Sequence, residues 1–335
     1  MKYSSRVFLY GPVAIFVLIL AAIVGHWFWA SNALSKRLDA LNGEPMLPGV
    51  TLRFEQKEMA GFPFRLDATF KNLDITIETK NGLARWKTEQ FAFHTLTHGS
   101  AQQVFEAAGK QTVTWTGGKG EARHFEFVPG SLRASAIEGN DGLQRFDLDL
   151  IELGSPALAA GHVQFHIRKD GDALQFVATL DAAQFSEKQT SAFGDVIKTL
   201  RLEGNINHGA SFDDFRAGRI DWRSALEDWR AHEGVLQLSK GDVAWKTVSL
   251  AATGTLALDD ERRPKGLLHL TVSGMNALSE EAAKRNIPKG ANQGLAAGLL
   301  EQVTQKPGEL SAGLAFKDGI AYVEQTPVMT LDTLY

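Results

Sequence analysis

The sequence predicts a mainly β protein with a few helices, in which an N-terminal transmembrane helix precedes an antiparallel, curved β-sheet or β-sandwich. Two observations lead to this fold class. Residues 7–30 contain no Asp, Glu, Lys or Arg, and this run is long enough to cross a bilayer. Beyond it, short segments alternate apolar and polar residues and are separated by turns rich in Gly, Asn and Asp. That alternation is typical of strands with one apolar face.

The composition indicates a folded chain and argues against several functional classes. The 335 residues include 20 Phe and 7 Trp, and only 22% are charged, which is too apolar for a disordered chain. The formal net charge of −4 argues against general nucleic-acid binding, which needs a basic surface. The absence of Cys excludes disulfides, thiol nucleophiles, Cys-ligated zinc, iron–sulfur clusters and a lipoprotein anchor.

The apolar run at residues 7–30 is predicted to be an uncleaved membrane anchor. As a helix it would extend about 36 Å at about 1.5 Å per residue, against a hydrocarbon core of about 30 Å. Lys2 and Arg6 precede it without an acidic residue, so the N-terminus is expected in the cytoplasm and the body outside. The residues assigned to the membrane interface are Trp27, Phe28 and Trp29. They differ from the small residues that a signal peptidase needs, so a cleaved signal peptide is the less favoured alternative.

Five segments are predicted along the chain. They are a short N-terminus (residues 1–6), the transmembrane anchor (7–30), a stalk (31–47), a first β unit (48–200) and a second β unit with helical insertions (201–335). The stalk ends where Gly43 and Pro45 interrupt a helical spacing of leucines. The division into two β units rests on the similar alternating patterns of residues 200–206 and 250–256.

The strand pattern is clearest at Phe64, Leu66, Ala68 and Phe70, which alternate with polar residues. Similar segments occur at residues 90–93, 146–151 and 162–167, and turn patterns occur at 81–82, 117–118, 140–142, 169–172 and 317–319. This spacing predicts a long antiparallel meander.

Three helices are predicted among the strands. The first begins after Asp221 and places Trp222, Leu226 and Trp229 on one face. The other two are expected within residues 182–200 and over residues 279–288, with a continuation at 293–305.

The polar residues show no strong catalytic or metal-binding pattern. The candidate pairs are His94 with His98, His162 with His166, and Asp147 with Asp149. Neither His pair has the third ligand that a zinc site needs, and the two Asp residues alternate with apolar residues as on a solvated strand face. Motifs for nucleophile elbows, phosphate-binding loops and zinc proteases are absent. We therefore expect no catalytic residues, no metal and no cofactor, and we predict that the protein is not an enzyme.

Six aromatic residues are the best candidates for the lining of a ligand groove or of a closed core. They are Phe125, Phe127, Phe165, Phe176, Trp222 and Trp229. A Trp on the apolar side of a helix is more often a core residue, and the sequence leaves both interpretations open.

Three segments resemble a known family. They are residues 61–65 (GFPFR), 250–270 (LAATGTLALDDERRPKGLLHL) and 316–327 (FKDGIAYVEQTP). In these segments the chain resembles the DUF2125 family of bacterial envelope proteins, to which no catalytic residues are assigned. The T-G-x-L-x-L-D pattern is also similar to the wider AsmA-like group of membrane-anchored periplasmic β proteins. This resemblance implies an inner-membrane protein with a periplasmic body and an AsmA-like open β-groove as one form of the sheet.

Two functions from different classes follow from these expectations. If the apolar sheet face is open, the protein is a noncatalytic periplasmic protein that binds or handles lipid acyl chains in envelope biogenesis. If the face is covered, the alternative is an envelope scaffold or assembly factor that binds a protein partner without a lipid ligand. A hydrolase built from scattered residues is a third hypothesis, which needs a pocket where Asp, His and Ser converge. The expected partners are the membrane and either a lipid or an envelope protein, with no nucleic acid.

Overall fold

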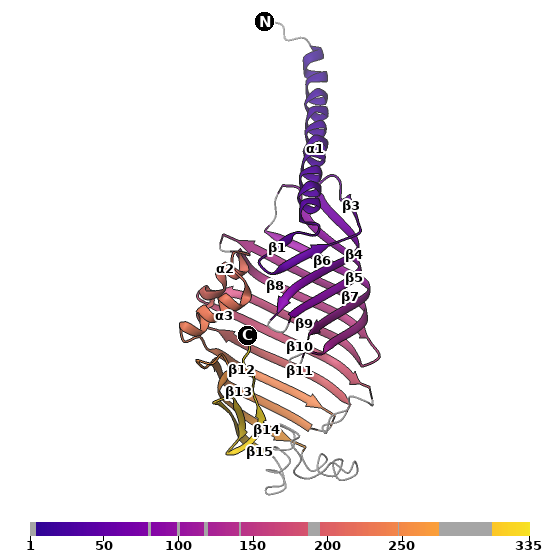
Figure 1. Ribbon diagram of the computed structural model, residues 1–335. Helices are drawn as coiled ribbons and strands as arrows, with labels where there is room; N and C mark the ends of the chain where they lie inside the picture. Colours follow the sequence, from indigo (N-terminus) through magenta and orange to yellow (C-terminus); the bar gives the residue numbers. More distant parts are fainter. Residues whose placement is uncertain are drawn as a thin grey trace.

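The computed structural model describes residues 5–79, 82–98, 101–116, 120–140, 142–186, 195–246, 248–274 and 310–335. Within these residues, seventeen strands form one large sheet in which every pair of strands is antiparallel. The sheet is curved and does not close on itself. The predicted fold class is therefore confirmed. Figure 1 shows α1 projecting from one end of the sheet, with β14 and β15 near the other end.

The strands follow one another as a meander from β4 to β17. Their bounds are β1 (Pro45–Leu47), β2 (Val50–Arg53), β3 (Gln56–Ala60), β4 (Arg65–Thr79), β5 (Gly82–Leu96), β6 (Gln102–Thr116), β7 (Ala122–Gly139), β8 (Gly142–Gly154), β9 (Leu158–Asp170), β10 (Ala173–Phe185), β11 (Val196–Ile206), β12 (Leu236–Trp245), β13 (Val248–Leu258), β14 (Pro264–Ser273), β15 (Leu310–Lys317), β16 (Ile320–Val323) and β17 (Thr326–Thr330). At the start of the sheet, β2 and β3 pair with different parts of β4, and β1 pairs with β2.

Helix α1 (Ser5–Leu41) contains the predicted anchor and most of the predicted stalk as one continuous helix. Among the described residues it is the one helix that is long and apolar enough to cross a membrane, by length and composition. Its C-terminal part is fixed to the sheet, because Lys57 in β3 donates hydrogen bonds to the Ser35 carbonyl (2.6 Å) and to Asp39 (2.7 Å). Leu38 packs with Phe70 and neighbouring apolar residues.

The sheet has an apolar face and a polar face, as strand β9 illustrates. Its Phe165 lies opposite Leu148 in β8 and Ala178 in β10, whereas the adjacent His166 lies opposite Asp147 in β8. Successive side chains of a strand point to opposite sides, so one side of the sheet carries the apolar set. We call this side the apolar face; its residues include Phe70, Phe91, Phe105, Leu148, Leu150, Val163, Phe165, Phe176, Leu180 and Leu200.

Backbone irregularities keep some apolar side chains on the apolar face where simple alternation would place them on the polar face. Phe70 and Leu73 are three positions apart yet belong to the same buried cluster, and Asn72 between them has φ +52°. The same arrangement joins Leu150 to Leu153, with Glu152 at φ +57°. Irregularities of this kind bend a strand and increase its twist, which accounts for the curvature of the sheet.

The connection between β11 and β12 contains the 3₁₀-helix η2 (Gly209–Phe212), α2 (Asp213–Arg216) and α3 (Trp222–Ala231), which lie at one margin of the sheet (Figure 1). The predicted helix beginning after Asp221 is confirmed as α3. Asp221 is its N-cap, and the carboxylate accepts a hydrogen bond from the Ser224 amide (2.8 Å).

The other two helix predictions and the division into two β units are not confirmed by the described residues. Within residues 182–200, residues 182–185 belong to β10 and residues 196–200 to β11, and these two strands pair with each other. These parts are therefore strand and not helix. The rest of this helix prediction falls mainly on residues 187–194, which lie outside the described residues. The predicted helix over 279–288 and its continuation at 293–305 also lie outside them. The boundary at 200–201 falls inside β11, and the division into two β units stays a prediction.

Candidate functional site

The apolar face begins at the base of α1 and continues along the whole sheet. Next to α1, Trp27, Ala30 and Leu66 form one buried cluster. Three further clusters follow, centred in turn on β4, on β8 to β11, and on β13 to β16. Apolar contacts therefore extend from α1 to the C-terminal strands.

A series of aromatic rings crosses the first strands of this face. The ring centroids of Phe70 and Phe91 are 6.1 Å apart, and those of Phe91 and Phe105 are also 6.1 Å apart. Phe105 in turn lies 5.6 Å from Phe93. The antiparallel register of β4, β5 and β6 places these rings side by side on the apolar face.

Most of these large side chains are only partly buried. Among the described residues, the buried aromatic side chains are Trp27, Phe70 and Trp229. The Phe residues of β5 to β10 that lie on the apolar face retain solvent exposure. The second sheet of a sandwich would enclose such side chains in a core about 10 Å thick. The described part of the chain therefore leaves the middle of the apolar face open.

Four of the six predicted lining residues share this face. Phe125 and Phe127 in β7 stack at 5.5 Å and pack against the cluster that contains Leu150. Phe165 lies opposite Leu148, and the ring of Phe176 lies over Gly204 in β11. A Cβ at Gly204 would come within 2.8 Å of that ring, so glycine leaves room for Phe176.

Trp222 and Trp229 lie elsewhere, in the helical connection at the sheet margin. Trp229 is buried, donates a hydrogen bond from Nε1 to the Asn207 carbonyl (2.9 Å) and packs closely against Gly234. The ring of Trp222 contacts Tyr335 edge-on at 6.2 Å. The structure therefore does not bring these two residues together with the four Phe residues.

Glu227 holds this helical connection to the C-terminus. Its carboxylate accepts hydrogen bonds from Arg230 (2.7 Å), Tyr335 (2.7 Å) and Arg262 (3.0 Å). These bonds lower the pKa of Glu227 to about 2. Burial, together with the bond to Glu227, raises the pKa of Tyr335 to about 12.

The candidate acid and histidine pairs lie on the polar face and bind each other. Asp149 accepts a hydrogen bond from His162 (2.6 Å), and Asp147 lies 2.7 Å from His166 Nδ1. The bond from His162 lowers the pKa of Asp149. Burial acts to raise the pKa of Asp147, but the bonds from His166 and Arg145 outweigh it and lower that pKa. These side chains form a hydrogen-bonded polar surface across β8 and β9.

No described group of three or more His, Asp or Glu residues is placed to hold a metal ion. In the other candidate pair, His94 hydrogen-bonds Asp67 across β4 and β5 (2.7 Å), and His98 lies just past the end of β5.

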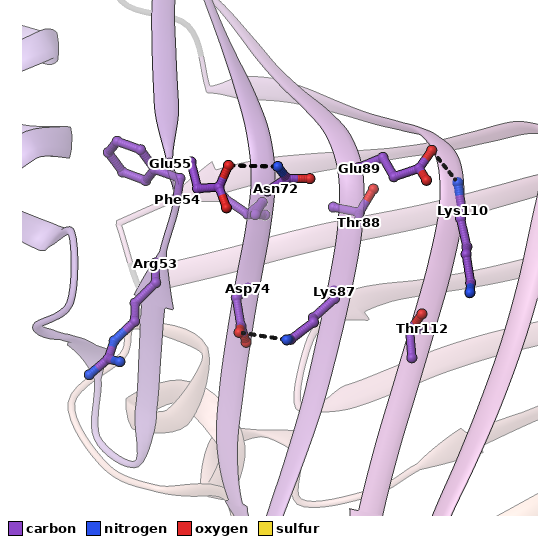
Figure 2. Close-up of a pocket in the computed structure, with 11 residues that line it drawn as sticks. Arg53, Phe54, Glu55, Asn72, Asp74, Lys87, Thr88, Glu89, Lys110 and Thr112 are labelled. Atoms are coloured by element: carbon purple, nitrogen blue, oxygen red, sulfur yellow. Dashed lines mark hydrogen bonds and ion pairs between the residues drawn. The ribbon is translucent and has the colours of Figure 1, made fainter.

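A shallow depression of about 440 Å³ also lies among charged side chains of β2, the β2–β3 connection and β4 to β6. Figure 2 shows that several polar residues around it bond one another. Glu55 accepts from Asn72 (2.7 Å), Glu89 accepts from the Lys110 amide (2.9 Å), and Asp74 lies 3.8 Å from Lys87. Several of its polar side chains are already bonded within the protein, so we assign the candidate site to the apolar face.

The family of uncharacterized proteins conserved in bacteria, DUF2125, matches residues 27–331. The chain belongs to this family. No curated protein matches the chain. The DUF2125 match covers the whole sheet and the part of α1 that packs on it, and the description assigns no activity to any residue.

Sequence reasoning did not identify every residue of the apolar face. Phe105 and Trp115 in β6 lie on it, as does Trp245 in β12. The register of the meander places them there: Phe105 lies opposite Phe93, which the alternation of β5 marks as apolar. These residues could have been predicted by pairing each strand with a neighbour whose alternation is clear and assigning opposite residues to the same face.

Proposed function

We propose that this DUF2125 protein is a noncatalytic, membrane-anchored protein whose apolar face binds lipid acyl chains in the bacterial cell envelope. Helix α1 crosses the inner membrane once, with the N-terminus in the cytoplasm and the sheet in the periplasm. Lys2 and Arg6 before the apolar run support this orientation.

The observation that carries the proposal is the row of partly exposed Phe side chains on the apolar face. Monomeric soluble proteins rarely expose a continuous apolar surface of this kind unless it binds something. An acyl chain is a suitable occupant, because each buried CH₂ contributes about 0.8 kcal/mol. The face also begins at the helix that we assign to the membrane, which is the nearest source of such chains.

Tryptophan fluorescence tests this proposal in the full-length chain. Among its seven Trp residues, Trp245 packs on the apolar face and Trp222 lies in the helical connection. One variant keeps only Trp245 and the other keeps only Trp222. In each variant, Phe replaces the other six Trp residues. On titration with a dibrominated fatty acid in unbrominated detergent, we expect saturable quenching of Trp245 and no quenching of Trp222, because bromine quenches on contact.

Equal quenching of both variants, or no quenching of Trp245, would contradict an acyl-binding face. The second result would instead favour the scaffold function, in which a protein partner covers the same Phe residues.

A further inference from the structure

The loop between β3 and β4, residues 61–64 (Gly-Phe-Pro-Phe), has a fixed backbone. We call it the GFPF loop. The Arg65 amide donates to the Gly61 carbonyl (2.9 Å), and Gly61 has φ +97°, where a Cβ would lie 2.7 Å from the Arg65 carbonyl oxygen. Thr97, just past β5, donates from its amide (3.0 Å) and its hydroxyl (3.1 Å) to the Phe64 carbonyl. These bonds hold the loop in one conformation at the end of the sheet.

The GFPF loop lies directly against α1. The Trp27 ring donates from Nε1 to the Arg65 carbonyl (2.8 Å), and it meets the Phe62 ring edge-on at 5.5 Å. His26 Nε2 lies 3.1 Å from the Thr97 carbonyl. Trp27 therefore packs on the protein itself, whereas the neighbouring Phe28 and Trp29 are exposed.

The side chains of the loop are exposed although they are large and apolar. Phe62 is 54% exposed and Phe64 is 58% exposed. Other exposed apolar side chains lie on the same part of α1 and at the end of β5: Phe28 (61%), Trp29 (69%) and Leu96 (37%). Together they make an aromatic-rich apolar surface around one level of the helix.

The position of these exposed side chains along α1 indicates that the membrane interface covers them. The uncharged part of α1 extends from residue 7 to residue 35, and Lys36 is its first charged residue after Arg6. A bilayer core needs about 20 apolar helical residues, so a span that begins at residue 7 reaches its far interface near residue 27. The GFPF loop meets the helix at Trp27. Aromatic side chains favour that interface.

We propose that the GFPF loop is a second membrane contact, in which Phe62 and Phe64 enter the interface of the bilayer that α1 crosses. The occupant of this surface is the lipid headgroup region, into which aromatic residues partition. With two contacts, α1 and the loop, the sheet has a fixed orientation on the membrane. The end of the apolar face at β3 to β5 is then held at the bilayer surface, where acyl chains would enter it. This inference rests on the proposed anchoring by α1.

The chain has no Cys, so single-Cys variants can each carry one fluorescent NBD label. The full-length protein is reconstituted in vesicles of phosphatidylethanolamine and phosphatidylglycerol. Phe64→Cys and Leu96→Cys place labels on the apolar surface, Val17→Cys tests the anchor, and Ser224→Cys in α3 is the control away from α1. Lipids carrying a nitroxide on the headgroup or deep in the acyl chain act as quenchers.

We expect headgroup nitroxides to remove most of the emission at positions 64 and 96 and to leave position 224 unchanged. We expect acyl-chain nitroxides to remove most of the emission at position 17. If position 17 is quenched but 64 and 96 behave like 224, the loop contact is overturned while the anchoring stands. If position 17 is not quenched either, the anchoring and the loop contact are both overturned.

Discussion

Replacement of Phe165 by Glu is expected to lower the phospholipid retained by the full-length protein about tenfold or more. Phe165 lies between Leu148 and Ala178 on the apolar face, so the carboxylate would lie against the bound acyl chains. Burial of an unpaired charge costs several kcal/mol, and 1.4 kcal/mol already corresponds to a tenfold change in affinity. The measurement is the molar ratio of phospholipid to protein after purification in detergent, determined by mass spectrometry.

The matched control for Phe165→Glu is Arg168→Glu in the same strand. Arg168 lies on the polar face and opposite Arg145, so the new carboxylate has water and a cation beside it. We expect this variant to retain as much phospholipid as the unaltered protein. Equal ratios for both variants, with folding verified by circular dichroism, would show that the apolar face does not hold the lipid.

Replacement of Trp229 by Ala is expected to lower the free energy of unfolding by about 3–5 kcal/mol, the usual cost of removing a large buried aromatic side chain. Trp229 is buried, and its indole N–H bonds the Asn207 carbonyl, which the variant would leave without this donor. Its ring also packs against Gly234 and lies 6.3 Å from Phe212. Urea denaturation followed by circular dichroism measures the change.

The control for this prediction is Trp222→Ala. Trp222 is partly buried and contacts Tyr335 and Arg223, so its removal should cost clearly less. Both variants should retain phospholipid under conditions in which they are folded, because neither residue lies on the apolar face. A Trp229→Ala variant that is as stable as the unaltered protein but loses its lipid would instead place Trp229 in the ligand site.

The sequence predicts those parts of the sheet in which local alternation decides the structure. In β9, Val163, Phe165 and Ile167 alternate with polar residues, and the structure places them on one face as expected. The pattern of Trp222, Leu226 and Trp229 likewise predicted α3 and its N-cap Asp221. These signals are local, because they depend only on the periods of a strand and a helix.

The parts that could not be predicted depend on non-local or irregular backbone structure. A regular alternation puts Phe70 and Leu73 on opposite faces, but the positive φ of Asn72 returns Leu73 to the apolar face. The amphipathic pattern of α3 predicts that Trp229 is covered, yet only the fold shows that the cover is Asn207 and Gly234. The openness of the apolar face is similarly a property of the whole sheet.

The most direct test of the central claim is photocrosslinking in native membranes. A photoreactive phenylalanine analogue is introduced at Phe176, which lies on the apolar face over Gly204, and separately at Val177, the next residue, on the polar face. After irradiation, the mass of the full-length protein reports any covalent lipid adduct. An acyl-binding face predicts a lipid adduct at position 176 and none at position 177. An unmodified mass at position 176, or equal adducts at both positions, would contradict it.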